Sequence, residues 1–270
     1  MEIGQARPAR IIVRFAGVAL CAPLFLAGCG SAADHTLEQA IERTYQIDPN
    51  TTISIRNLDG SIQVYGSSSA EMKLQAIKKA YTAERLNEIS VNVSAQPGSI
   101  SIQTDFPPRR KWAFSDRSGT VDYLLVVPQI SRMLRLELAN GEVWVEGIRS
   151  GEVRANLGNG RLFNRNCFAN LHSSVKTGVL AVIYDWWEPG KLSINAQIEA
   201  GNASALIPGE ASFHLVAESV RGKIVNDLAD QEEQQGRAVG KIDILVGEAA
   251  RADIRIHAID GDIKVAEANP

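Results

Sequence analysis

Apolar and polar residues alternate along most of this chain, which is the pattern of half-buried β-strands. The alternation is clear in Thr51–Asn57 and resumes in Ser61–Tyr65, with Leu58-Asp59-Gly60 between the two runs. An Asp-Gly pair between alternating runs is a hairpin signal, so this stretch predicts two strands joined by a tight turn. Further strands are predicted at 72–79, 89–93, 99–103 and 120–128. The predicted class is all-β.

Two segments break the two-residue period. Residues 83–88 read Ala-Glu-Arg-Leu-Asn-Glu, a run of helix formers without β-branched side chains, and this composition predicts one short helix. Before the first predicted strand, Leu37, Ile41 and Tyr45 recur at helical spacing, which indicates a short helix there as well.

The second half of the chain carries a repeat. Glycines at positions 141, 160, 178, 201, 222, 240 and 261 are separated by 19, 18, 23, 21, 18 and 21 residues, and each precedes a short alternating strand. Such a near-constant step indicates units that bury their apolar faces by stacking, and a glycine at each corner permits a positive φ. We therefore predict a single-stranded, solenoid-like stack of short strands. A Greek-key sandwich is the alternative, although it needs no glycine at a fixed step.

The alternation also predicts which side chains the stack buries. We expect a stack from about residue 48 to 268, with these positions facing inward: Ile62, Val64, Val143, Val145, Leu162, Val182, Ile224, Ile242, Ile244, Ile263 and Val265.

The first 28 residues have the composition of a secretory signal. Three arginines precede an apolar run from Phe15 to Leu26, which is shorter than the roughly 20 residues of a transmembrane helix. The run ends in Leu26-Ala27-Gly28-Cys29, which resembles the lipobox of bacterial lipoproteins. The resemblance implies cleavage before Cys29 and acylation of its thiol and its new amine. An ordinary signal peptide followed by a chance cysteine is the alternative.

The expected organisation has three parts: a lipoprotein signal peptide at 1–28, a tether at 29–45 and a β-strand-repeat domain at 46–270. Several acyl chains would hold the protein firmly, because a single chain gives only marginal membrane binding. Cys29 is followed by Gly30 and Ser31 and not by an aspartate, which resembles the pattern of outer-membrane lipoproteins if the source has two membranes.

The net charge bears on the class of partner, and the cysteine positions bear on the role of Cys167. The formal net charge is −3, and removal of residues 1–28, with three arginines and one glutamate, leaves −5. No basic face is implied, which argues against nucleic acid as a partner. Cys21 lies in the signal and Cys29 is the predicted lipid site, so we expect the remaining Cys167 to be a small buried apolar residue.

The ordered series of strand motifs resembles a bacterial family. The motifs are Ile53–Gly66, then Val121–Pro128, then Asn-Gly-Glu-Val units such as Leu138–Gly147. Over about residues 44–268 they are similar to the putative-adhesin β-strand-repeat family. The resemblance implies a right-handed β-helix in a secreted or lipid-anchored protein, and it supports fold and location more than activity.

The sequence holds no recognisable catalytic motif. None of the four histidines has a second His or Cys at metal-ligand spacing, and a nucleophile elbow, a phosphate loop and a dinucleotide fingerprint are missing. Stacking in chain order would place Asp243 and Asp262 on neighbouring coils, either as an acid pair of a carbohydrate-active enzyme or as ordinary solvent-exposed acids. We expect no catalysis, no metal and no cofactor.

The best candidate for a contact surface is Tyr184-Asp185-Trp186-Trp187, which is followed by Pro189-Gly190. The step from Gly178 to Gly201 is the longest of the six and leaves residues for a protrusion. Adjacent strand residues point to opposite faces, so we expect one indole to be accessible and the other to pack. The alternative is that both indoles cap an edge of the stack.

These observations favour a lipid-anchored cell-envelope protein that binds, adheres or scaffolds without catalysis. Its expected partners are the membrane, through the anchor, and an envelope protein or glycan. Two alternatives stay open: an envelope sensor or accessory protein of a membrane signalling system, and a carbohydrate-active β-helix enzyme.

Overall fold

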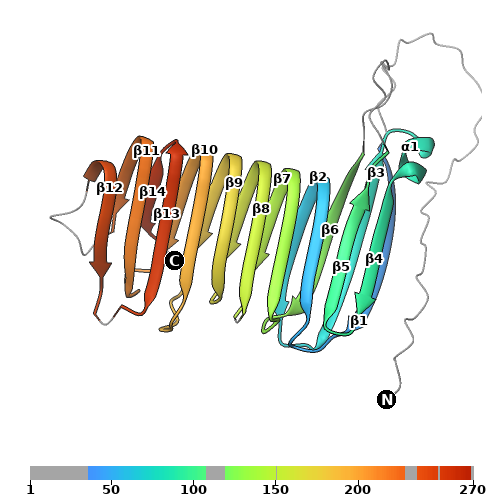
Figure 1. Cartoon of the computed structure of the whole chain (residues 1–270), viewed down its shortest axis with the longest axis horizontal. Coiled ribbons are helices and arrows are strands. Elements are labelled where there is room, and N and C mark those ends of the chain that lie inside the picture. Colours follow the sequence, from blue (N-terminus) through green and yellow to red (C-terminus); the bar gives the residue numbers. More distant parts are fainter. Residues whose placement is uncertain (1–35, 108–118, 150, 229–235, 249, 269–270) are drawn as a thin grey trace, which may run out of the picture.

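The computed structural model describes residues 36–107, 119–149, 151–228, 236–248 and 250–268. Strands make up 73% of these residues, and the one helix among them, α1 (Ala83–Glu88), has six residues. The all-β class and the short helix at 83–88 are therefore confirmed. Figure 1 shows the strands side by side in one long row, from β12 at one end to β1 and β4 at the other.

The strand bounds show how the row relates to the chain. Along the row the order is β1-β3-β6-β2-β7-β8-β9-β10-β13-β11-β12, with β14 beside β10 and β11, and with β5 between β2 and β4. Chain order is kept from β7 to β10 and is broken at both ends. The strands are β1 (Leu37–Gln46), β2 (Thr52–Ser67), β3 (Glu71–Ala80), β4 (Ser90–Gln96), β5 (Ser99–Asp105), β6 (Thr120–Pro128), β7 (Met133–Glu146), β8 (Glu152–Arg165), β9 (Asn170–Ile183), β10 (Ser193–Ile207), β11 (Phe213–Asp227), β12 (Gly236–Val246), β13 (Ala252–Asp260) and β14 (Ile263–Glu267).

Five of these strands, β2, β7, β8, β9 and β10, form a parallel stack. Each has 14 to 16 residues and contains one glycine at which the backbone takes a positive φ. The pairing keeps a single register on both sides of that glycine, so each glycine lies beside the next one along the row. Apolar side chains at every second position therefore fall on one common side, and the stack buries that side.

The glycines of these strands form a glycine ladder, made of Gly60, Gly141, Gly160, Gly178 and Gly201. Their φ values lie between 125° and 137°, and a Cβ on Gly160 would lie 1.8 Å from the carbonyl oxygen of Gly141. Two features therefore require glycine at each ladder position: the positive φ of the backbone and the close approach of the neighbouring strand. Four of the predicted corner glycines are confirmed here. Gly60 is a bend within β2 and not a hairpin, because both halves of β2 pair in parallel with β7.

The last units do not stack in chain order. β13 and β14 lie between β10 and β11 and pair in parallel with both, while β12 pairs antiparallel on the far side of β11. The ladder continues in the order of the row, through Gly261 and then Gly222. Gly240 has a positive φ of 94° and lies where the pairing of β12 with β11 shifts register, as expected of a corner, but no atom lies within 4 Å of a Cβ position, so it is not part of the ladder. This end departs from a uniform single-stranded β-helix.

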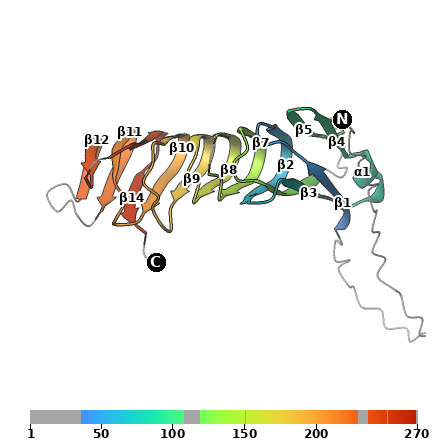
Figure 2. The ribbon, with the colours of Figure 1, turned by 90° about the horizontal axis from the view of Figure 1, so that it is seen from below.

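At the N-terminal end, β5 and β6 pair in parallel with β2, and the strands beyond them pair antiparallel. β5 and then β4 extend the first half of β2, whereas β6, β3 and β1 extend its second half. Figure 2 shows the two extensions on opposite sides of the row. The helix predicted around Leu37, Ile41 and Tyr45 is wrong, because Leu37–Gln46 forms β1 and pairs with β3 along its whole length. The folded part therefore begins ahead of residue 46, inside the predicted tether.

The core contains every side chain that the alternation placed inward. All eleven are buried, and Cys167 is buried as well, at 1% exposed. One inward position is charged: Lys78, in β3, is 7% exposed. Its ammonium donates to the carbonyl oxygens of Leu86 (3.1 Å) and Ile89 (3.0 Å) at the C-terminal end of α1, where a cation is favoured.

Candidate functional site

Trp186 and Trp187 lie in the turn between β9 and β10, and their side chains diverge. Trp186 is 43% exposed. Trp187 packs against the core, with its ring centroid 5.3 Å from that of Tyr184 and 5.8 Å from that of Phe213. The expected split into one accessible and one packed indole is therefore what the structure shows. Whether the accessible one is a contact surface stays a prediction.

The exposed indole is supported by the turns of the two preceding units. Phe168, in the turn after β8, lies with its ring centroid 6.1 Å from that of Trp186. The guanidinium carbon of Arg149, in the turn after β7, lies 5.8 Å from the Phe168 ring centroid, a cation–π distance. The three planar groups thus follow one another along the row.

The edge of the indole is held by a carboxylate. Trp186 Nε1 donates to Glu188 Oε1 at 3.1 Å, and Arg149 Nη1 donates to Glu188 Oε2 at 2.6 Å. Burial acts to raise the pKa of Glu188, but the hydrogen bonds from Arg149 and Trp186 outweigh it, so the pKa lies below its ordinary value. Glu188 is therefore ionised at neutral pH and fixes the orientation of the indole.

A second ion pair borders the same turn. Arg165 Nε donates to Asp185 Oδ2 at 2.8 Å, and Asn166 exchanges two hydrogen bonds with Asp185, through its side-chain amide (2.7 Å) and its side-chain oxygen (2.8 Å). The hydrogen bond from Arg165 is the main cause of the lowered pKa of Asp185. Asn166 has a φ of 50°, a conformation that asparagine tolerates better than most residues. These contacts fix the start of the turn.

Beneath the turn the polar groups are buried and inert. Tyr184, fully buried, donates its hydroxyl to the carbonyl oxygen of Cys167 at 2.5 Å. Burial raises the pKa of the Cys167 thiol to about 12 and raises the pKa of Tyr184 well above its ordinary value. A thiol with this pKa is protonated at neutral pH and is a poor nucleophile.

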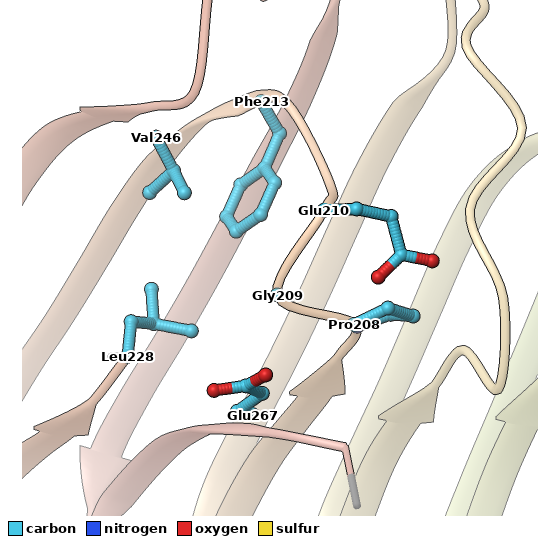
Figure 3. A pocket seen from close by; sticks show the side chains of 7 residues that line it. All are labelled: Pro208, Gly209, Glu210, Phe213, Leu228, Val246 and Glu267. Atoms are coloured by element: carbon cyan, nitrogen blue, oxygen red, sulfur yellow. The ribbon is translucent and has the colours of Figure 1, made fainter. Parts of the chain in front are cut away.

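A pocket of about 240 Å³ lies close to this turn. Phe213 joins the two features, because its ring contacts Trp187 and also lines the pocket. Figure 3 shows the carboxylates of Glu210 and Glu267 at the pocket, across from the apolar side chains of Phe213, Leu228 and Val246. The complete lining is Pro208, Gly209, Glu210, Phe213, Leu228, Val246 and Glu267.

The candidate acid pair is not assembled. Asp243 lies in β12 beside β11, whereas Asp262 follows β13 and accepts a hydrogen bond from the backbone of Lys223. The prediction of neighbouring coils is wrong because β13 and β14 enter the row between β10 and β11. Asp243 instead pairs with His214 Nε2 at 2.8 Å, and Asp253 pairs with His214 Nδ1 at 3.1 Å. These two carboxylates raise the pKa of His214, Asp243 more than Asp253.

Other predicted features cannot be placed. Cys29 and the signal at 1–28 lie outside the described residues. In the part of the chain that the structure describes, no group of three or more His, Cys, Asp or Glu side chains is arranged to hold a metal ion. Within the same residues, no helix has the length and hydropathy needed to cross a membrane.

Sequence reasoning missed the partners of Trp186. Arg149, Phe168 and Trp186 each follow a ladder glycine by eight residues, being Gly141, Gly160 and Gly178 in turn. Because the units stack in register, equal offsets become neighbours in space. Alignment of the units on their glycines was the signal that could have found them.

Comparison with known proteins gives a likeness of fold. No family model and no curated protein matches the chain. A solved structure described as a "putative cell adhesion protein" from Clostridium sporogenes covers 84% of this chain and 98% of its own, at a TM-score of 0.50 and 12% identity. The match to a "putative adhesin" from Bacteroides fragilis covers 84% of this chain and 96% of that protein's chain, at a TM-score of 0.31 and 14% identity. At these identities the first likeness is one of fold alone.

Proposed function

We propose that this protein is a non-catalytic binding module of the cell envelope, of the adhesion type, held to a membrane by a lipid on Cys29. The observation that carries the binding role is Trp186, an exposed indole held rigidly on a turn by Phe168 and Glu188. Fixed aromatic side chains with open faces are typical anchors of interfaces. The fold shared with a protein described as a "putative cell adhesion protein" supports the same role.

The central parallel stack suits such a role. We propose that β2, β7, β8, β9 and β10 are successive coils of a short right-handed β-solenoid, whose antiparallel ends protect it from further pairing. Each coil contacts its two neighbours, so the stack is a rigid rod that displays its turns along one side. Side chains at equal offsets then form rows, and a row is suited to contact an extended partner.

Catalysis is not part of the proposal. A hydrolase of glycosidic bonds needs a carboxyl group on either side of the scissile bond. Of the pair considered above, Asp243 lies in β12 and Asp262 lies between β13 and β14, and the two have different partners. The acids around Trp186 are already neutralised by arginines. The arrangement therefore favours recognition.

The anchor is tested by Cys29→Ala, with Cys21→Ala as the matched control in the same signal. We expect wild type and Cys21→Ala to fractionate with membranes and to carry a lipid-modified N-terminal cysteine in mass spectra. Cys29→Ala should lose both properties. Membrane retention of Cys29→Ala, together with an unmodified wild-type protein, would contradict the lipid anchor.

The binding role is tested by capture of envelope material on the immobilised full chain. We expect Trp186→Ala to retain less material than wild type. Leu245→Ala is the control, because Leu245 is 67% exposed and lies on β12, the last strand of the row, beyond β13 and β11 from the turn between β9 and β10. Equal capture by wild type and both variants would show that the turn is not a contact surface.

A further inference from the structure

The row of planar side chains along the turns stops at Trp186. The position eight residues after a ladder glycine is occupied by Arg149, Phe168 and Trp186 in successive units. In the next unit, after Gly201, the same position is occupied by Gly209. β9 and β10 pair with Ile183 beside Leu206, and Tyr184 donates its backbone N–H to the carbonyl oxygen of Leu206. That register, continued by three residues, sets Gly209 opposite Trp186. The next step of the row therefore has a backbone and no side chain.

The pocket already described adjoins this step. Gly209 lines it, together with the apolar rings of Pro208 and Phe213 and the carboxylates of Glu210 and Glu267. Among the described residues, neither carboxylate forms an ion pair or a side-chain hydrogen bond. Neither indole lines this pocket, so a ligand that uses both features must extend from Trp186 past Gly209 to the pocket, where two carboxylates are free to accept hydrogen bonds.

Electrostatics restrict what that ring can be. The two ion pairs that border Trp186, Arg149–Glu188 and Arg165–Asp185, cancel in charge, while their side chains stay between 37% and 40% exposed. Glu210 and Glu267 add two negative charges, and Lys191, in the turn between β9 and β10, adds one positive charge, so the balance of these groups is negative and disfavours an anionic ligand. Ionised carboxylates accept hydrogen bonds and donate none, so the ligand must be rich in donors.

We propose that Trp186 and the pocket at Gly209 form a binding subsite for a saccharide without negative charge. One face of a sugar ring is apolar and would cover the indole of Trp186, while hydroxyl groups of that ring or of the next ring of an oligosaccharide would donate hydrogen bonds to Glu210 and Glu267. The inference rests on the proposed binding role of this turn and names its ligand class. A protein partner fits less well, because it would have to cover the exposed charged pairs around a single indole.

A larger side chain at position 209 should fill the subsite with a group of the protein itself. Gly209 does not have a positive φ, and the nearest atom to a Cβ there is the flexible end of Glu267. Gly209→Phe should therefore fold normally and place an aromatic ring at the vacant step of the row. We expect it to block the ligand without loss of melting temperature, whereas Trp186→Ala removes the stacking face itself.

The experiment uses the full-length protein in detergent on an immobilised panel of neutral, amino-substituted and acidic oligosaccharides. We expect binding to neutral or amino-substituted members and none to acidic ones. Affinity should fall about tenfold or more in Trp186→Ala, should be lost in Gly209→Phe, and should be unchanged in Leu245→Ala. Melting temperatures are measured for each variant, and a variant that is unfolded is replaced by Trp186→Leu or Gly209→Leu.

Three results would overturn the proposal: no binding to any non-acidic saccharide, preferential binding to acidic ones, or unchanged affinity in both folded variants. Its failure is separable from that of the proposed function. If Trp186→Ala loses capture of envelope material but no saccharide binds, the turn is a contact surface for another class of partner. If neither assay depends on Trp186, both proposals fall.

Discussion

The glycine ladder makes a sharp prediction about two alanine substitutions. Gly160 and Gly240 both have a positive φ, 135° and 94°, so alanine at either position is strained by the backbone. They differ in their surroundings: a Cβ at 160 would lie 1.8 Å from the carbonyl oxygen of Gly141, whereas a Cβ at 240 would have no neighbour within 4 Å. Gly240→Ala therefore measures the backbone strain, and Gly160→Ala measures the strain together with the close approach of two strands.

The magnitudes follow from the geometry. A positive φ costs alanine about 1–2 kcal/mol, which is the whole cost expected at 240. At 160 the Cβ and the oxygen must also separate by about 1.2 Å to reach the 3.0 Å below which real contacts are essentially never found. Such a shift breaks at least two hydrogen bonds between β7 and β8, at about 1–1.5 kcal/mol each. We expect about 4 kcal/mol at 160.

Thermal unfolding followed by circular dichroism at 218 nm, or by calorimetry, is the assay. A domain of this size loses about 2–4 °C of melting temperature per kcal/mol. Gly160→Ala should therefore melt roughly 12 °C below wild type, and Gly240→Ala roughly 4 °C below it. Equal losses at the two positions would refute the reasoning, because they would mean that the neighbouring strand imposes no steric requirement at the ladder.

Four other substitutions test individual contacts. Trp187→Ala should cost about 3 kcal/mol of unfolding free energy, because it removes a ring packed on the core, and Trp186→Ala less than about 1 kcal/mol; similar losses would mean that both indoles are structural. His214→Gln should lower the melting temperature more at pH 5.5 than at pH 9, because the folded-state pKa of His214 is raised and its stabilising charge is present below the unfolded pKa and lost as pH rises; a pH-independent difference would contradict this. Lys78→Met should cost about 1–3 kcal/mol in urea unfolding, because two helix carbonyls lose their donor, and an unchanged midpoint would show that water replaces it.

The central stack was predictable because two signals agree there. The two-residue period fixes which side of each strand is buried, and the recurring glycine fixes where each strand bends. Ile62, Val143 and Leu162 are all fully buried as the period requires. Their glycines also stand at matching positions, so both the burial and the register of these units follow from spacing.

The ends were not predictable from the same signals. Every unit carries the same alternation, so the alternation does not say which unit lies beside which. Gly240 has the spacing and the positive φ of a corner, yet β12 runs antiparallel to β11. At the other end, Leu37, Ile41 and Tyr45 have helical spacing but pair with β3 as a strand, because ten residues of sheet pairing outweigh the weak preference of a short segment.

Lys78 shows how a local rule fails for a physical reason. The alternation of β3 gives position 78 an inward direction, and lysine is among the residues least often buried. Desolvation lowers its pKa. The cost is offset because the ammonium reaches the carbonyl oxygens of Leu86 and Ile89 at the end of α1. The compensation depends on how α1 sits over β3, which neither segment encodes alone.

The proposed contact surface depends on the register of the units, and for that reason no contiguous sequence motif marks it. The position just before each ladder glycine gives an independent case: Asn140 donates its side-chain amide to Asp59 at 2.8 Å, and Asn159 donates to Asn140 at 2.9 Å, although 81 and 19 residues separate these pairs along the chain. The offset of eight obeys the same rule and brings Arg149, Phe168 and Trp186 into one row. A row of this kind can be ended by a single glycine, as at position 209, without disturbing the core beneath it. Recognition in such a fold can therefore change by substitution at one offset in one unit, while the inward positions that hold the stack together stay the same.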